Sequence, residues 1–166
     1  MPPQRPRTTA FLLSQLGALA AATFADLTRE QDLSPSDAGV LRLLGRHPGI
    51  SQRALADRLG AVPSRVVALV DSLEKRGLVT RTRSTVDRRT HELTLTDDGH
   101  TALRRLRSAA ERHEEAMLGP LSETERSALD ELLATLATAH GLDPEVHPGY
   151  RRPPTEPQAD DEHEAS

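Results

Sequence analysis

The fold is decided by residues 51–96, SQRALADRLGAVPSRVVALVDSLEKRGLVTRTRSTVDRRTHELTLT, in which the spacing of apolar side chains changes once, from helical to alternating. Ser51 is a preferred N-cap residue type, and Gly60 marks the end of the short helix that follows it. A second helix is expected to start near Pro63, and its apolar residues recur at offsets of 3, 4 and 7 up to the expected C-terminal cap Gly77. The stretch therefore predicts two short helices joined by a tight turn.

The rest of this stretch has the pattern of a β-hairpin. Residues 78–84 and 91–96 are rich in Thr, Val and Leu and alternate with period two, while residues 85–90 between them form a charged loop. A major groove of B-DNA admits one helix, the preceding helix crosses the backbone, and a ribbon beside them reaches the neighbouring minor groove. The pattern therefore predicts a winged helix-turn-helix with a two-stranded wing.

Other helices flank this unit and make the predicted fold mainly α. Ser34 and Pro35 have the residue types of an N-cap and first helical position, Thr96 caps a long helix to about Met117, and Ser122 opens a last helix with a capping-box sequence. The predicted buried side chains of the middle helices are Val40, Leu41, Leu44, Ala54, Leu55, Leu59, Val66, Leu69, Val70, Leu73, Leu103, Leu106 and Ala110.

The N-terminal segment allows two interpretations. Arg5 and Arg7 precede a small and apolar run over residues 10–25, as in a secretory signal peptide. However, polar residues such as Ser14 and Thr23 interrupt that run, and the leucines recur at helical spacing, which favours a packed amphipathic helix. No run of 18 or more apolar residues is present, so no membrane span is expected.

Composition and charge set the domain organisation and exclude several classes of site. The 166 residues fit one domain with a tail: a flexible N-terminus at 1–7, a folded domain at 8–142 with its DNA-binding core at about 34–98, and an acidic, Pro-rich, disordered tail at 143–166. The absence of cysteine excludes disulfides, thiolate metal sites and thiol switches. The chain has only three aromatic residues, which argues against modules that stack single-stranded bases.

Four motifs in a fixed order resemble one family. These are 49-GISQRALADRLG-60, 70-VDSLEKRGLV-79, 87-DRR-89 and 93-LTLTDDG-99, and the chain is similar over about residues 11–140 to the MarR family of bacterial transcription regulators. The resemblance implies a homodimer that binds a pseudo-palindromic operator of double-stranded DNA and represses until a signal releases it. It also implies that the first and last helices form the dimer, through Leu12, Leu16, Leu19, Leu129, Leu132, Leu133 and Leu136.

Candidate DNA contacts come from three places. The resemblance implies that residues 87–89 form the tip of the wing, where Asp87 would orient Arg89, which enters the minor groove beside Arg88. Without the resemblance, these three charged residues are interpreted as a solvated turn. At the start of the recognition helix, Arg65 is the candidate for guanine readout or, alternatively, for a phosphate contact. The other candidates are Ser51, Gln52 and Arg53 at a helix start suited to a phosphate, and Ser64, Val67 and Ala68 on the recognition helix.

The recognition helix departs from the family's common pattern. Members commonly have Ser-Thr-Val-Thr-Arg where this chain has SRVVA at residues 64–68, so the base preference of relatives is not carried over. Val67 can instead contact a thymine methyl group.

The resemblance places an effector in the crevice between the winged domain and the dimer helices. The expected ligand is small and apolar or aromatic, and anionic, with Phe24, Arg42, Arg46 and His47 as candidate pocket residues. No cofactor or metal is expected, because no two histidines are spaced as a ligand pair; the densest cluster, Glu111, His113, Glu114 and Glu115, is interpreted as a solvated helix face.

Two other classes of protein are alternatives to a cytoplasmic repressor. An enzyme is disfavoured because the sequence has no Gly-rich phosphate loop, no thiol and no recognisable nucleophile turn. A winged helix used as a protein-interaction scaffold is the alternative, and the nine basic residues between Ser51 and His100 argue against it.

Overall fold

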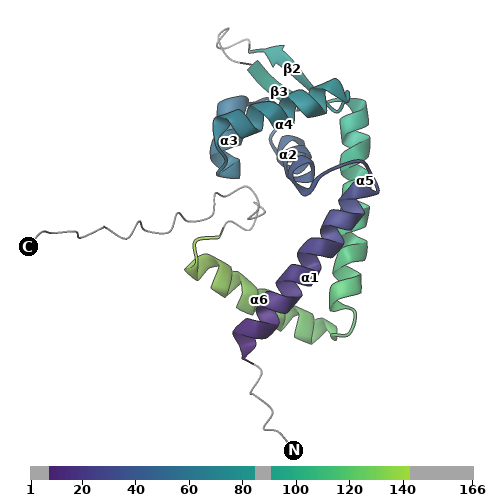
Figure 1. Ribbon diagram of the computed structural model, residues 1–166, viewed down its shortest axis with the longest axis vertical. Helices are drawn as coiled ribbons and strands as arrows, with labels where there is room; N and C mark the ends of the chain where they lie inside the picture. Colours follow the sequence, from purple (N-terminus) through teal and green to yellow (C-terminus); the bar gives the residue numbers. More distant parts are fainter. Residues whose placement is uncertain (1–7, 85–90, 143–166) are drawn as a thin grey trace, which may run out of the picture.

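The computed structural model describes residues 8–84 and 91–142 (Figure 1). Within these ranges the chain forms α1 (Thr9–Arg29), α2 (Pro35–Arg46), β1 (Ile50–Ser51), α3 (Gln52–Leu59), α4 (Pro63–Lys75), β2 (Val79–Arg83), β3 (His91–Leu95), α5 (Asp97–Leu118) and α6 (Glu123–Ala139). The predicted helices are present there, with ends within a few residues of those expected. The predicted flexible N-terminus, wing tip and acidic tail lie outside the described residues.

The helices begin where the sequence supplies a capping side chain. Ser34 and Asp37 form a capping box at the start of α2, and Ser122 does the same with Glu125 at the start of α6. The Thr96 hydroxyl accepts a hydrogen bond from the Gly99 N–H at the start of α5. These bonds satisfy N–H groups that have no partner within the helix, which is why local sequence alone located these starts.

The sheet has one strand more than the sequence indicated. Its order is β1-β3-β2, all antiparallel, with Ile50 opposite Leu93 and Val79 opposite Leu95. The prediction of a two-stranded ribbon missed β1, because two residues are too few to show an alternating pattern.

The hydrophobic core lies between α2, α3, α4 and the sheet, at one end of the molecule (Figure 1). Most of the predicted core residues are buried, including Leu41, Leu55 and Val70. The exceptions include Ala110, which is exposed, whereas its neighbour Ala109 is buried. Ala109 lies one turn before His113, whose ring packs 6.0 Å from that of Phe24 in α1, so this side of α5 is the one that α1 covers.

Helices α1, α5 and α6 form an arm that extends away from this core (Figure 1). Helix α1 runs beside α5, but α6 buries none of its residues. The turn between α5 and α6 is held by Arg126, whose guanidinium donates to both carboxylate oxygens of Glu115 at 2.9 and 3.3 Å. This hydrogen bond, together with the guanidinium charge, lowers the pKa of Glu115 below its ordinary value.

By length and composition, α1 is long and apolar enough to cross a membrane, with a mean hydropathy of 1.5 over an 18-residue window. The expectation that no stretch is long and apolar enough to span a bilayer does not hold for α1 by these two criteria, because Ser14, Gln15 and Thr23 interrupt the apolar run without introducing charge. The finding is weak evidence for a membrane segment, since core helices and signal sequences pass the same test.

Candidate nucleic-acid interface

Helices α3 and α4 pack against each other as a helix-turn-helix. Gly60 takes a left-handed conformation with φ of 59°, which reverses the chain after α3, and Pro63 occupies the first turn of α4. Glycine adopts this conformation without steric cost, and proline is pre-set for a helix start. The connection is therefore only a few residues long, and it fixes the angle between the two helices.

Helix α4 has one buried face and one exposed face. Val66, Val70 and Leu73 point into the core and are fully buried. The predicted contact residues Ser64, Arg65, Val67 and Ala68 are all exposed, with Val67 at 41%. The start of α4 therefore presents a cation and an apolar side chain on the surface opposite the core.

The start of α3 lies next to this surface. The Ser51 hydroxyl accepts a hydrogen bond from the Ala54 N–H at 3.2 Å, so Ser51 is the N-cap, as expected. Gln52 and Arg53 line a shallow depression of about 480 Å³ together with Val67 and Pro63 of α4. The structure thus brings the predicted contacts of the two helices to one surface.

Arg81 of β2 has a role that sequence reasoning missed. Its guanidinium forms ion pairs with Asp71 at 2.5 Å and Glu74 at 2.6 Å, both on α4. Arg81 lies opposite Leu93 in the sheet, so its side chain projects from the same face as this buried leucine, towards the helices. Arg81 therefore positions α4 against the sheet and neutralises acidic groups on it. The alternating strand pattern places Arg81 on the inner face and could have revealed this role.

The predicted wing-tip residues Asp87, Arg88 and Arg89 lie outside the described residues. Strands β2 and β3 lead to this tip, and Arg83 at the end of β2 is exposed.

A pocket of about 410 Å³ lies between α1, α2 and α5. Phe24, Arg42 and Arg46 line it as expected, and Arg107 of α5 adds a third guanidinium that the sequence analysis had not named. His47 is not among the lining residues; its Nε2 lies 3.0 Å from Nη1 of Arg58 in α3. The structure thus places His47 outside the lining of this pocket, because α2 ends at Arg46 and His47 follows as its C-cap.

The candidate metal cluster on α5 does not assemble. Within residues 8–84 and 91–142, no group of three or more His, Cys, Asp or Glu side chains is placed to hold a metal ion. His113 packs against Phe24, and Glu115 binds Arg126.

The leucines proposed for the dimer leave an apolar surface on the arm. Leu16 and Leu19 of α1 are 54% and 55% exposed, and Leu132 of α6 is 65% exposed. Leu12, Leu133 and Leu136 are also exposed, and Leu129 is half-buried.

Comparisons with known proteins agree with this architecture. The model of the MarR family matches residues 31–90. The HTH-type transcriptional repressor MdtR of Bacillus subtilis is 31% identical over 114 residues, which are 69% of this chain and 74% of that protein.

Two solved structures are similar over nearly their whole length. One is the transcriptional repressor CouR bound to a 23-mer DNA duplex, with 35% identity, a TM-score of 0.71 and coverage of 82% of this chain and 99% of that chain. The other is the PcaV transcriptional regulator from Streptomyces coelicolor in complex with its natural ligand, with 28% identity, a TM-score of 0.67 and coverage of 84% and 99%. With its helix-turn-helix, its small sheet and these relatives, the chain belongs to the MarR family of transcription regulators.

Proposed function

We propose that this protein is a homodimeric, ligand-responsive repressor that binds a pseudo-palindromic operator in the cytoplasm. The observation that carries the proposal is the exposed start of α4, where Arg65 and Val67 lie on the surface opposite the buried face. A helix that presents such side chains at its N-terminal end can enter a major groove and read base edges there. The similarity to CouR, a repressor bound to a DNA duplex, supports this use of the surface.

The proposed contacts divide by type. Arg65 reads guanine, Val67 contacts a thymine methyl, and Ser64 and Ala68 complete the helix surface in the groove. Gln52 and Arg53, with the helix start at Ser51, contact phosphates and fix the register. Arg88 and Arg89 insert at the neighbouring minor groove, with Asp87 orienting Arg89.

The proposed dimer uses the arm. Helix α6 buries no residue within the described chain, and such a helix gains stability mainly by packing an apolar face against a partner. A second copy of the chain supplies the complementary surface in an isologous dimer. The two α4 helices of a dimer then meet half-sites spaced by about one helical turn of DNA.

The proposed effector binds in the pocket between α1, α2 and α5. Its lining combines Leu103, Leu106 and Phe24 with the guanidinium groups of Arg42 and Arg107. Apolar walls with a few cationic groups suit a small aromatic or apolar carboxylate. The similarity to PcaV, a regulator solved with its natural ligand, supports a ligand at this fold.

The experiment that tests DNA binding is fluorescence anisotropy with the DNA upstream of the protein's own gene, titrated at several salt concentrations. Arg89→Ala should weaken binding and reduce the salt slope by about one unit, because one cation at the phosphates is lost. Arg29→Ala is the matched control, since Arg29 is an exposed arginine on α1 paired with Asp26. Equal binding to unrelated DNA, or none, would instead favour the interaction-scaffold alternative.

The effector is tested on the same complex with benzoate and related aromatic carboxylates as probes. A ligand that releases DNA must bind the DNA-incompetent form more tightly. Arg42→Gln should reduce this response, whereas His47→Ala should leave it unchanged because His47 does not line the pocket. A response that survives Arg42→Gln but disappears in His47→Ala would contradict the pocket assignment.

A further inference from the structure

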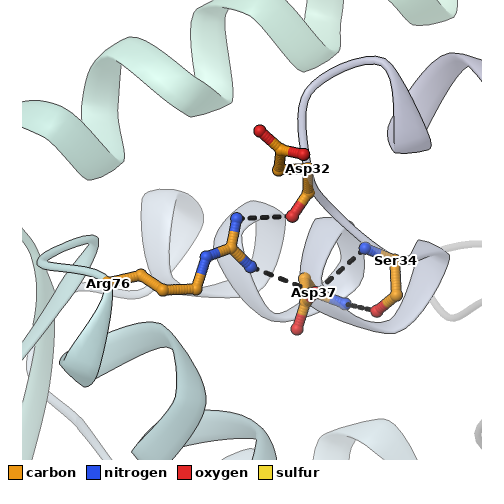
Figure 2. A network of polar contacts seen from close by, with 4 residues as sticks. All are labelled: Asp32, Ser34, Asp37 and Arg76. Atoms are coloured by element: carbon orange, nitrogen blue, oxygen red, sulfur yellow. Dashed lines mark hydrogen bonds and ion pairs between the residues drawn. The ribbon is translucent and has the colours of Figure 1, made fainter.

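Arg76, at the C-terminal end of α4, reaches the connection between α1 and α2 (Figure 2). Its Nη2 donates a hydrogen bond to the backbone carbonyl of Asp32 at 2.5 Å. Its Nη1 lies 3.6 Å from the Asp37 carboxylate, which also accepts a hydrogen bond from the Ser34 N–H at 2.9 Å. One guanidinium therefore contacts the end of α1 and the start of α2 together.

The backbone at this connection is held in an uncommon conformation. Asp32 has φ of 56°, in the left-handed region that favours glycine. The Leu33 N–H donates to the Thr28 carbonyl and the Asp32 N–H to the Arg29 carbonyl, which closes α1 as a glycine would normally do. Such a conformation persists where several contacts determine it, and the Arg76 bond to the Asp32 carbonyl is one of them.

The geometry of the contact makes it directional. The hydrogen bond from the Arg76 guanidinium to the Asp32 carbonyl restricts rotation as well as distance, and the ion pair with Asp37 at 3.6 Å adds a non-directional attraction. The Asp37 side chain is only 10% exposed and that of Arg76 32%, which limits the competition of water for this contact. The apolar packing of α2 against α1 and α4, by contrast, is non-directional.

We propose that Arg76 is a positioning residue that fixes the angle of α4 relative to the α1 arm. In the dimer of the proposed function, on which this part of the inference rests, that angle sets the spacing of the two recognition helices. The contact of Arg76 with the α1–α2 connection forms a joint between α4 and the arm. Pro35 and Ala38, next to Ser34 and Asp37, line the proposed effector pocket, so a bound effector lies beside this joint. The joint is thereby the element through which a ligand shifts the helix spacing.

The angle is measured directly with two spin labels and pulsed electron resonance. Because the chain has no cysteine, Ser14→Cys on α1 and Ser72→Cys on α4 provide unique attachment sites, and both serines are exposed. Labelled chain is diluted in excess unlabelled chain so that only distances within one chain are recorded. We expect Arg76→Ala to broaden the distance distribution about twofold or more, because the directional contact is lost.

Two further variants guard against a simple loss of folding. Arg76→Lys keeps a cation at the helix end but lacks the fork, and Asp37→Asn keeps an acceptor for the Ser34 N–H but removes the charge facing Arg76. Both variants should broaden the distribution of distances between the two labels, and the circular dichroism of both should show native helix content. Arg29→Ala, which removes an exposed ion pair on α1, should not. An unchanged distribution in folded Arg76→Ala or Arg76→Lys, or an equal change in Arg29→Ala, overturns the inference.

A second readout uses operators in which one base pair is inserted or removed between the half-sites. The unmodified protein should lose about tenfold or more in affinity for each altered operator, and Arg76→Lys only about threefold or less, because a looser joint accommodates other spacings. Equal discrimination by the two proteins contradicts the inference. If the unmodified protein binds no operator, the proposed function fails, and the label distances alone decide the role of Arg76.

Discussion

At the scale of single residues, an arginine contributes to DNA binding only if its charge is not already used within the fold. Several of the basic residues between Ser51 and His100 make intramolecular contacts, among them Arg58 with His47, Arg76 with the α1–α2 connection, and Arg81 with α4. Arg53 and Arg83 are exposed near the proposed interface. A count of cations along the sequence therefore overestimates the number of phosphate contacts.

The first prediction concerns Arg81. Arg81→Gln should lower the free energy of unfolding by about 1 kcal/mol, because both carboxylate partners are more than a third exposed and solvent screens the pairs. It should also weaken DNA binding, since two unpaired carboxylates then lie on α4 near phosphates. Adding Asp71→Asn and Glu74→Gln should restore affinity, as measured by anisotropy at constant salt. A triple variant that binds as weakly as Arg81→Gln would refute this electrostatic account.

The second prediction concerns Arg65. Arg65→Ala should relax the base preference at one position in each half-site at a cost of about 1 to 3 kcal/mol, because a bidentate contact to guanine is lost. Arg65→Lys should retain most non-specific affinity but not the preference, since an ammonium lacks the fork. Competition among operators with single base changes measures both. An equal loss for every operator would show that Arg65 contacts a phosphate instead.

At the scale of elements, the turn between α4 and β2 is the place where the recognition helix α4, the sheet and the start of α5 meet. Gly77 ends α4 in the left-handed conformation, with φ of 71°. The Thr96 hydroxyl donates to the Gly77 carbonyl at 2.5 Å, and the Thr96 N–H donates to the Leu78 carbonyl at 3.2 Å. One side-chain and one backbone hydrogen bond therefore dock the start of α5 onto the end of the recognition helix.

Gly99 permits this docking, and its substitution is the third prediction. A Cβ at Gly99 would overlap the Leu78 carbonyl oxygen, a backbone atom that cannot move without shifting the turn. Gly99→Ala should therefore destabilise the fold by about 3 kcal/mol. Gly17→Ala is the matched control: apart from its own helix backbone and chain neighbours, its added Cβ would meet nothing within 4 Å, and alanine favours a helix by about 0.5 to 1 kcal/mol. Urea unfolding measures both; similar stability of the two variants would disprove the close approach.

At the scale of the whole molecule, the chain has a well-packed lobe and an arm whose apolar surface is open. Most of the fully buried residues, such as Leu41 and Leu73, lie in the lobe, while α6 has none. Exposed leucines lie on both α1 and α6. Apolar side chains gathered on a surface commonly mark an interface with another protein. This imbalance supports the proposed homodimer.

The fourth prediction tests the dimer. Leu132→Asp combined with Leu133→Asp introduces two charges on the exposed face of α6. Burial of unpaired carboxylates in an interface is costly, so sedimentation velocity should show monomer or aggregate. Asp130→Asn with Glu131→Gln, at adjacent exposed polar positions, is the control and should leave the dimer intact. An intact dimer in the leucine variant would exclude this surface from the interface.

The sequence by itself determined the type and order of the helices and of the wing strands. Ser34, Ser51, Thr96 and Ser122 cap the helices that they were predicted to cap, because capping acts over three residues and its signal is local. The periods of the apolar residues likewise identified the buried faces of α2 and α4. The motif order, combined with these elements, was sufficient to identify the family.

Only the tertiary structure decided what each charged side chain binds and how the elements meet. The contact of Arg76 with Asp32 joins residues 44 positions apart, and the pairing of β1 with β3 joins Ile50 to Leu93. Local patterns carry no record of such partners, because any acidic group or carbonyl could serve until the chain has folded. The same reason explains why His47 was placed in the pocket although its ring lies beside Arg58, and why Ala110 was exchanged for Ala109. The direction from which a neighbouring element approaches is set by packing of the whole chain, and a helix period alone does not define it.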